Sequence, residues 1–318
     1  MTQTILVTGT SGFIWFHLSQ KLLERWDKVI WIDNENDYYD VNLKAARRNI
    51  LLENSDFKYY KWNLEDMDFI KKVFDENQID KVCNLAWQAG VRYSLQNPAA
   101  YIQSNLVWFF NVIENAKQHN IKNFVYASSS SVYWKNERIP FDVEDKVDHP
   151  ISLYAATKKS NELIAHVYSH LYKMPTIWLR FFTVYGKYAR PDMAVNIFAD
   201  KILKWQPIDV FNHWNMKRDF TYVDDIVSGV IRCLDSNFDY EVFNLWNNNV
   251  VQLEYLIELM ENNLGKKAIK NYMDIQPGDV PATRANIDYT IEKLGWQPTT
   301  KIEEWIKITM DWYKTFYK

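Results

Sequence analysis

Short apolar runs alternate with amphipathic stretches through the first half of the chain. The runs are short enough for buried strands and cover residues 5–8, 29–33, 57–61, 81–85, 124–128 and 176–181. Between them, apolar residues recur at helical spacing over residues 16–25, 64–76, 100–119 and 153–172. Strands that alternate with helices in this way predict an α/β fold built on a doubly wound parallel sheet, a Rossmann fold.

The alternation weakens after Tyr185. Helical patterns are expected over residues 192–204, 224–234 and 253–264, and a strand over residues 208–211. We therefore expect a smaller mixed α/β C-terminal lobe that covers the mouth of the sheet.

The chain length agrees with two lobes, because 318 residues exceed one typical core. We expect the dinucleotide-type domain at residues 1–185 and the second lobe at residues 186–318. A segment at about 215–246 is expected to return to the first domain.

Charge, cysteine content and hydropathy exclude several classes of protein. A net charge of −3 gives no general attraction to nucleic acid or to a membrane surface. The two cysteines, Cys83 and Cys233, fit buried thiols in a reducing compartment better than a disulfide. Because we find neither a signal peptide nor a long apolar span, we expect a soluble, cytoplasmic protein.

The first predicted strand leads into a turn that contains glycine. Gly9 and Gly12 occupy the positions that make the tight turn and let the backbone approach a pyrophosphate. Asp33 ends the second predicted strand, where a carboxylate binds the ribose hydroxyls of NAD and repels the extra phosphate of NADP. The strand, the glycine turn, the following helix and the second strand with its terminal Asp33 together predict an NAD site. The alternative for Asp33 is a solvated acid at the end of a strand.

The third glycine position of this fingerprint holds Trp15, where a helix normally packs closely on a strand. Trp26 and Trp205 follow predicted helices, at positions that commonly adopt a left-handed backbone. Three more tryptophans occupy predicted turns: Trp134, Trp214 and Trp246. Tryptophan therefore recurs where the backbone favours glycine.

The composition shows the same imbalance. The chain has 8 glycines and 14 tryptophans, whereas average usage of about 7% glycine would give roughly 22. Trp296 and Trp312 suit their surroundings, and the other twelve are in question: Trp15, Trp26, Trp31, Trp62, Trp87, Trp108, Trp134, Trp178, Trp205, Trp214, Trp246 and Trp305. Our hypothesis is that the gene uses UGA for glycine and that these codons are read here as tryptophan. The alternative is an aromatic-rich protein whose tryptophans are genuine.

Tyr154 and Lys158 lie four residues apart in a predicted helix and therefore share a face. A lysine ammonium beside a phenol favours the phenolate and lowers a pKa that starts near about 10, which yields a base usable at neutral pH. Such a pair alone also fits surface packing. Here a serine run from Ser128 to Ser131 ends a predicted strand and can present a hydroxyl to the same substrate oxygen.

Eight stretches together resemble the extended short-chain dehydrogenase/reductase family, and within it the UDP-glucuronate 4-epimerases, over essentially the whole chain. They are NDYYDVNL (36–43), QAGVRYS (88–94), ASSSSVY (127–133), SLYAATK (152–158), LRFFTVYG (179–186), RPDMA (190–194), MKRDFTY (216–222) and QPGDV (276–280). The departures are the twelve tryptophans and residues 187–189.

The resemblance implies NAD-dependent 4-epimerisation of a UDP-sugar, UDP-glucuronate to UDP-galacturonate, through a transient 4-keto intermediate. By resemblance, Ser129 is the catalytic hydroxyl, Tyr154 the acid and base, and Lys158 its electrostatic partner. The implied cofactor contacts are Gly9, Gly12, Phe13, Ile14, Asp33, Asn34, Asn63, Leu64, Leu85, Ala86, Gln88, Tyr154 and Lys158. The implied substrate contacts are Arg92, Ser129, Ser131, Thr183, Arg190, Arg218 and Asp279. No metal is implied.

Two arginines are expected to bind the anionic groups of the substrate. The resemblance assigns Arg190 to the glucuronate carboxylate, which a guanidinium can hold in a bidentate pair. Holding that carboxylate also suppresses loss of CO₂ from the intermediate, which is a β-keto acid. Arg218 is assigned to the UDP pyrophosphate; a surface ion pair is the alternative for either residue.

The family also implies a homodimer formed through residues 153–172 and 107–113. Alternative activities are a UDP-glucose or UDP-N-acetylglucosamine 4-epimerase and a nucleotide-sugar dehydratase or decarboxylase. Enzymes of the last two kinds carry acids where this chain has Ser130 and Ser131, which disfavours them. An inactive dinucleotide-binding protein would follow if the tryptophans were genuine and closed the site.

Overall fold

The computed structural model describes residues 2–9, 11–136, 138–214, 216–275 and 283–317. Its main feature is a seven-stranded sheet in which every pair of neighbours is parallel, in the order β10-β6-β5-β4-β1-β2-β3. The strands are β1 (Thr4–Thr8), β2 (Lys28–Asp33), β3 (Phe57–Lys61), β4 (Lys81–Asn84), β5 (Asn123–Ser129), β6 (Thr176–Phe181) and β10 (Tyr240–Leu245). The order of the first six is that of a Rossmann fold, so the predicted fold class is confirmed.

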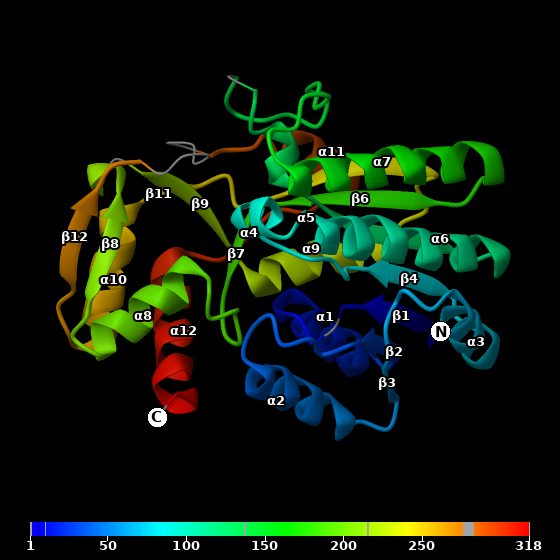
Figure 1. Cartoon of the computed structure of the whole chain (residues 1–318), viewed down its shortest axis with the longest axis horizontal. Helices are drawn as coiled ribbons and strands as arrows, with labels where there is room; N and C mark the ends of the chain where they lie inside the picture. Colours follow the sequence, from blue (N-terminus) through cyan, green and yellow to red (C-terminus); the bar gives the residue numbers. More distant parts are fainter. Residues whose placement is uncertain (1, 10, 137, 215, 276–282, 318) are drawn as a thin grey trace.

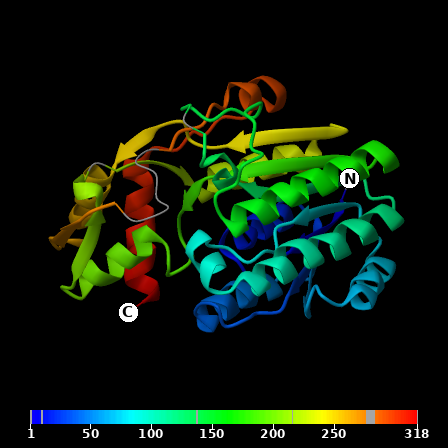
Figure 2. The ribbon, with the colours of Figure 1, turned by 45° about the horizontal axis from the view of Figure 1, so that its top comes forward.

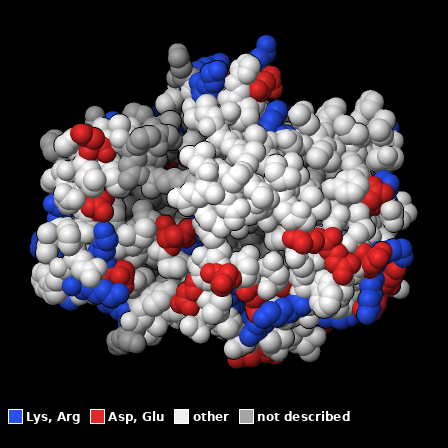
Figure 3. Space-filling model, viewed as in Figure 1, with Lys and Arg blue, Asp and Glu red and all other residues white. Residues whose placement is uncertain are grey.

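Helices cover both faces of this sheet, and each face has its own apolar core (Figure 1). The large helices are α1 (Phe13–Glu24), α2 (Val41–Leu52), α3 (Met67–Asn77), α6 (Trp108–Gln118), α7 (Leu153–Tyr172) and α9 (Val223–Asp235). Helix α1 packs on α9 and β2, whereas α6 packs against α3 and α7. Figure 3 shows few charged side chains over α6 and α7.

The helix expected over residues 100–119 is present as one continuous helical run that contains a π-helical turn. It consists of α5 (Pro98–Tyr101), the π-helical turn η1 (Ile102–Val107) and α6, and the separate short helix α4 (Val91–Gln96) precedes it. Asn105 in η1 is buried, accepts a hydrogen bond from the Gln88 N–H at 2.8 Å and donates to the Thr157 hydroxyl at 3.0 Å. The widened turn thus ties the loop after β4 to helix α7, and such turns are frequent at functional sites.

The second lobe lies beside the carboxyl ends of the strands (Figure 2). A three-stranded sheet joins β7 (Thr183–Tyr185), β9 (Lys217–Tyr222) and β11 (Val250–Gln252), and a two-stranded sheet joins β8 (Pro207–Phe211) and β12 (Ile269–Met273). Its helices are α8 (Ala194–Leu203), α10 (Leu253–Leu264) and α12 (Ile302–Phe316), and the short turn η3 (Asn212–Trp214) contacts β8 and β12. Helix α11 (Asp288–Leu294) packs on β10 of the large sheet, and the short turn η2 (Ser130–Tyr133) packs on α7. The elements α9 and β10 belong to the large sheet and its helices.

Two of the questioned tryptophans have the backbone that glycine favours. Trp26 follows α1 with φ +69° and Trp205 follows α8 with φ +57°, and their side chains are 76% and 60% exposed. The predicted left-handed positions are therefore confirmed. Trp134 lies in a turn as expected but has φ −61°, so its backbone does not demand glycine.

Two further sequence expectations concern cysteines and membranes. Cys83 and Cys233 are both buried and unpaired, as expected for thiols in a protein core. Within the described residues, every helix is too short or too polar to cross a bilayer.

Candidate active site

A cavity of about 480 Å³ opens where the carboxyl ends of the parallel strands meet the second lobe. Binding at this edge is general for open α/β sheets. The first domain supplies the glycine turn after β1, the end of β2, the loop after β4 and the end of β5. The second lobe supplies Thr183, Arg190 and Met193, so the cavity is formed by both lobes.

The turn after β1 requires its first glycine. Gly9 has φ +74°, and a Cβ placed on it would lie 2.5 Å from the Ala86 Cα. Gly12 precedes helix α1 without a side-chain cap, so the first N–H groups of this helix are available to an anion. The turn therefore has the shape and the donors that a pyrophosphate needs.

Asp33 lies beside this turn at the end of β2. Its carboxylate accepts hydrogen bonds from the Ser11 N–H at 2.8 Å and the Glu35 N–H at 2.6 Å. Burial raises the pKa of Asp33, and these two backbone hydrogen bonds oppose the rise. A carboxylate held at this place fits the ribose hydroxyls of NAD.

A buried oxygen of the turn itself adds to the fit. The Ser11 hydroxyl has no hydrogen-bond partner within the described parts of the chain. Buried polar atoms are normally satisfied, so a bound polar ligand is a reasonable partner. Together with Gly9, Gly12 and Asp33, this hydroxyl suits the adenosine and pyrophosphate parts of NAD.

Five of the questioned tryptophans line the same cavity, and two of them, Trp15 and Trp87, lie between the phosphate turn and Lys158. Trp15 lies against the turn, with its Cδ1 2.6 Å from where a Cβ on Gly12 would be. Its ring meets that of Trp87 edge to face at 5.0 Å, and the Lys158 ammonium lies 3.9 Å from the Trp87 ring centroid. The indoles of Trp15 and Trp87 thus fill the space between the phosphate turn and Lys158. If these two residues are genuine tryptophans, they obstruct the NAD site; if they are glycines, the obstruction is absent.

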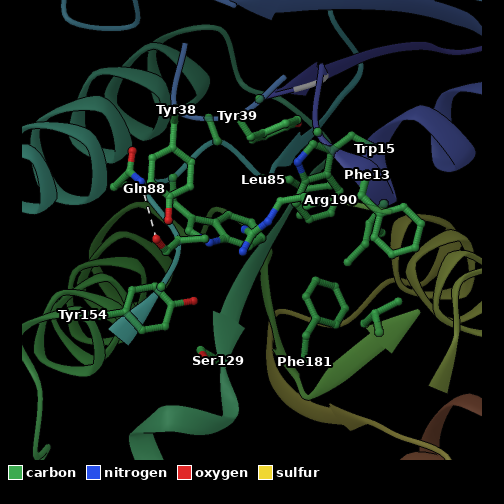
Figure 4. A pocket seen from close by; sticks show the side chains of 18 of the residues that line it. Phe13, Trp15, Tyr38, Tyr39, Leu85, Gln88, Ser129, Tyr154, Phe181 and Arg190 are labelled. Atoms are coloured by element: carbon green, nitrogen blue, oxygen red, sulfur yellow. Dashed lines mark hydrogen bonds between the residues drawn. The ribbon is translucent and has the colours of Figure 1, made fainter. Parts of the chain in front are cut away.

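The proposed catalytic residues come from β5 and α7. Ser129 ends β5, and its oxygen accepts hydrogen bonds from the Ser131 N–H at 3.2 Å and the Ser131 hydroxyl at 3.0 Å. Ser152 caps α7 by accepting from the Ala155 N–H at 3.1 Å, which fixes the first turn that carries Tyr154. Figure 4 shows Tyr154 and Ser129 on one side of the cavity, with Trp15 and Phe13 toward the other.

Lys158 lies one turn further along α7. It is buried and donates a hydrogen bond to the Ala127 carbonyl at 3.1 Å. Burial lowers the pKa of Lys158 well below its usual value, and the charge of Glu162 opposes this.

The expected lowering of the Tyr154 pKa is wrong for this chain as it stands. Burial raises the pKa of Tyr154, while the hydrogen bond with Ser129, the charge of Arg190 and the hydrogen bond with Trp87 act in the opposite direction. Lys158 is not among the groups that act on this pKa; its ammonium donates to the Ala127 carbonyl and lies against the Trp87 ring.

Arg190 reaches the cavity from the loop after β7. Its Nε and Nη2 each donate to the Asp192 carboxylate at 2.9 Å. This geometry shows that the guanidinium can hold a carboxylate in a bidentate pair. Thr183 and Ser131 line the cavity together with Arg190, as expected for groups that bind the sugar.

Most expected contacts of the cofactor and substrate line this cavity: Gly9, Gly12, Phe13, Ile14, Asp33, Asn34, Leu64, Leu85, Ala86, Gln88, Ser129, Ser131, Tyr154, Thr183 and Arg190. Lys158 and Asn63 lie outside the lining, and Arg218 on β9 donates to the Lys217 carbonyl at 3.1 Å. Asp279 and the side chain of Arg92 lie outside what the structure describes.

Several residues of the lining were given no role in the sequence analysis, among them Tyr38, Tyr39 and Lys44. The two tyrosines line the cavity from the segment after β2, and Lys44 lines it from the first turn of α2. The Tyr39 hydroxyl donates to the Ser11 carbonyl at 2.9 Å, and the Lys44 ammonium donates to the Asn36 side-chain oxygen at 2.9 Å. Tyr38 and Tyr39 lie in the family-like stretch at residues 36–43, to which we assigned no role, and Lys44 directly follows it.

Comparison with known proteins agrees with this geometry. Residues 5–245 match the model of the NAD dependent epimerase/dehydratase family. Protein CapI of Staphylococcus aureus is 50% identical over 99% of either chain, and UDP-glucuronate 4-epimerase 4 of Arabidopsis thaliana is 44% identical over 99% of this chain and 76% of that protein. UDP-glucuronic acid 4-epimerase from Bacillus cereus, solved in complex with UDP-glucuronic acid and NAD, has a TM-score of 0.92 at 32% identity and covers 99% of this chain and 100% of that chain.

Proposed function

Because the chain belongs to the NAD dependent epimerase/dehydratase family, we propose that it is an isomerase that uses NAD to invert C4 of a UDP-sugar. The substrate pair is UDP-glucuronate and UDP-galacturonate. One observation carries the proposal: Ser129, Tyr154 and Arg190 line the same cavity as Asp33 and the glycine turn. A proton acceptor, a carboxylate-binding cation and a dinucleotide site are thus next to one another.

Each of these residues has a distinct task. Tyr154 accepts the proton of the sugar 4-hydroxyl and later returns it, and Ser129 holds the same oxygen by a hydrogen bond. Lys158 supports the tyrosine through its positive charge. When bound, NAD accepts the hydride from C4 and returns it to the opposite face after the 4-keto sugar has turned over, so it is not consumed.

Arg190 holds the sugar carboxylate. The 4-keto sugar is a β-keto acid, and a carboxylate fixed by a guanidinium is kept from the geometry for loss of CO₂. Of the described residues that line the cavity, Asp33 is the one acid, and it lies at the cofactor turn. The positions of Ser130 and Ser131 therefore offer no carboxylate for dehydration or decarboxylation, which favours epimerisation.

A homodimer fits the surface of α6 and α7. Leu163, Val167 and Leu171 follow one another at helical spacing along α7 and are exposed, as is Phe110 on α6. Figure 3 shows few charges over this face. An exposed apolar patch of this kind is typical of a protein interface.

We also propose that the protein works in the cytoplasm, because a reducing compartment suits its two free thiols.

The activity is tested with the full-length protein, prepared both as printed and with glycine at the twelve questioned positions. We expect the active form to interconvert UDP-glucuronate and UDP-galacturonate without added NAD⁺, because the cofactor is retained and regenerated. Chromatography of the nucleotide sugars decides between the alternatives. A UDP-pentose as main product would indicate a decarboxylase, turnover restricted to UDP-glucose would indicate a neutral-sugar epimerase, and bound NAD without product would indicate an inactive binding protein.

A second measurement tests the carboxylate site. We expect Arg190→Ala to weaken UDP-glucuronate about tenfold to hundredfold, because a charge-assisted hydrogen bond contributes about 1.5–3 kcal/mol. Affinity for UDP-glucose, which has no carboxylate, should change far less. Titration calorimetry with both sugars gives the comparison. Equal losses would assign Arg190 to the UDP moiety or to the fold.

A further inference from the structure

A buried ion pair lies behind the proposed catalytic residues. Glu162 on α7 and Arg180 on β6 have side chains that are 0% and 3% exposed. The Arg180 Nε donates to Glu162 Oε1 at 3.1 Å, and its Nη2 donates to Oε2 at 3.0 Å. The two charges therefore meet in a bidentate pair without solvent, a geometry that aligns helix α7 on the strand.

Polar side chains extend this pair to the strand end that bears Ser129. The Ser128 hydroxyl donates to Glu162 Oε1 at 2.5 Å. Arg180 Nη1 donates to the Tyr133 hydroxyl at 2.6 Å, and this hydroxyl donates to Asn244 Oδ1 on β10 at 2.9 Å. Four elements, β5, η2, β6 and β10, are thus connected to one face of α7.

That face is the catalytic one. Tyr154, Lys158 and Glu162 follow each other at intervals of four residues on α7 and lie on successive turns. Ser128, which donates to Glu162, directly precedes Ser129. The ion pair therefore contacts both elements that carry the proposed catalytic residues.

We propose that Glu162 and Arg180 are positioning residues, which hold α7 and the end of β5 in register, and that the carboxylate of Glu162 favours the protonated form of Lys158. This rests on the proposed function of the site. Neither residue lines the cavity, so the pair acts through Lys158, Tyr154 and Ser129.

The charges around Glu162 support an electrostatic part of this role. Glu162 is the one charged group with a resolved effect on Lys158 among the described residues, and it opposes the loss of the Lys158 proton on burial. Arg180 and Lys159 also face Glu162, the latter with its Nζ at 3.7 Å. The remaining ionisable neighbours are tyrosines whose pKa values are raised by burial, so they stay neutral near pH 7: Tyr126, Tyr133 and Tyr240.

Stability alone is a weak explanation for such a pair. Buried ion pairs replaced by apolar residues of similar size often leave a protein as stable or more stable, because burial costs both charges their hydration. A purely structural pair would therefore be replaceable, whereas a positioning pair would not.

The test is the substitution Glu162→Gln, which keeps the shape of the side chain and removes its charge, in the active form of the full-length protein. We expect the alkaline limb of the kcat/KM profile to move to lower pH by about 1 unit, since an opposite charge nearby typically shifts a pKa by about 1–3 units. We also expect kcat to fall more than KM changes. The matched control is Glu114→Gln, which removes a carboxylate that binds Lys117 and Tyr168 across α6 and α7 and should leave the profile in place.

A double variant separates stability from positioning. Glu162→Gln combined with Arg180→Met leaves no unpaired buried charge, so we expect the unfolding temperature to recover relative to Glu162→Gln while the pH profile stays shifted. A double variant whose profile matches the parent would overturn the proposal.

A readout independent of turnover completes the test. NMR of protein labelled with ¹³C,¹⁵N-lysine, assigned with Lys158→Arg, gives the pKa of Lys158 directly. We expect it to fall in Glu162→Gln. An unchanged value would refute the role of the pair even if no epimerase product were found, and a fallen value without product would count against the proposed function alone.

Discussion

Replacing Tyr154 with phenylalanine is expected to lower kcat by about 10²–10⁴, the usual contribution of a general acid–base group. Tyr154 is the proton acceptor of the proposed site, and its substitution removes the hydroxyl but keeps the ring. The ring packs edge-on against Tyr101, with centroids 6.1 Å apart, so the fold and the cofactor turn should be unaffected. Steady-state kinetics gives kcat, and absorbance of the cofactor released on denaturation gives the NAD content.

The matched control is Tyr93→Phe, which makes the same change one ring further from the cavity. The Tyr93 ring lies 6.1 Å from Tyr101, and its hydroxyl accepts a hydrogen bond from Asn97 at 3.1 Å on an exposed face. We expect its activity to stay close to the parent. Activity of Tyr154→Phe within threefold of the parent would assign proton transfer to another group.

The six expected strands of the large sheet agree with the structure to within one residue at either end. They are predictable because a strand covered on both faces is a nearly continuous apolar run. The short strands β7, β11 and β12 are different. β7 and β11 have three residues each, and most side chains of β12 are exposed. None of the three has the apolar run or the alternation of apolar and polar residues that marks a strand.

The same contrast holds within the site. Asp33 and Ser129 could be predicted because parallel strands bring their carboxyl ends to one edge, and Tyr154 because it shares a helix face with Lys158. Lys44 could not be predicted, because its place in the cavity depends on how the segment before α2 folds, where its ammonium donates to Asn36. The pKa of Tyr154 is set by burial, which depends on packing between distant segments and not on the spacing of Tyr154 and Lys158.

The questioned tryptophans differ from the tryptophans of an ordinary protein core in their hydrogen bonding and packing. Indole N–H groups are buried without a hydrogen-bond partner, within the described part of the chain, in Trp31, Trp108, Trp134, Trp178 and Trp305. The two tryptophans that suit their sequence context differ from each other. Trp296 donates to the Asp225 carbonyl at 3.1 Å and the Ser228 hydroxyl at 2.9 Å, whereas the Trp312 N–H is also buried without a partner among the described residues. Each unsatisfied buried donor costs about 1–3 kcal/mol.

Crowding adds to this cost. The Trp305 ring stacks on Tyr222 with centroids 3.0 Å apart, and the Trp246 ring stacks on Phe182 at 3.5 Å. Aromatic pairs normally keep their centroids about 4.5–7 Å apart, so these indoles are overpacked. Overpacking typically costs about 1–3 kcal/mol at each site.

The printed chain is therefore expected to be insoluble or free of NAD, and the chain with glycine at the twelve positions to fold and bind NAD. Unsatisfied N–H groups, crowded rings and the left-handed backbones of Trp26 and Trp205 together consume much of a typical stability of about 5–15 kcal/mol. Trp15 and Trp87 also fill the space between the phosphate turn and Lys158, which glycine would open. Solubility and released cofactor compare the two chains.

Returning glycine only at positions 15 and 87 separates the blocked cavity from the unstable fold. If this variant is soluble but binds no NAD, the obstruction lies elsewhere in the cavity, at Trp62, Trp108 or Trp134. The mass of the protein isolated from its own cells is the direct measurement, because each glycine in place of tryptophan lowers it by one fixed difference. We expect twelve such differences. An active native enzyme with the mass of the printed sequence would instead establish the tryptophans as genuine, and would require the indoles of Trp15 and Trp87 to move aside for the cofactor.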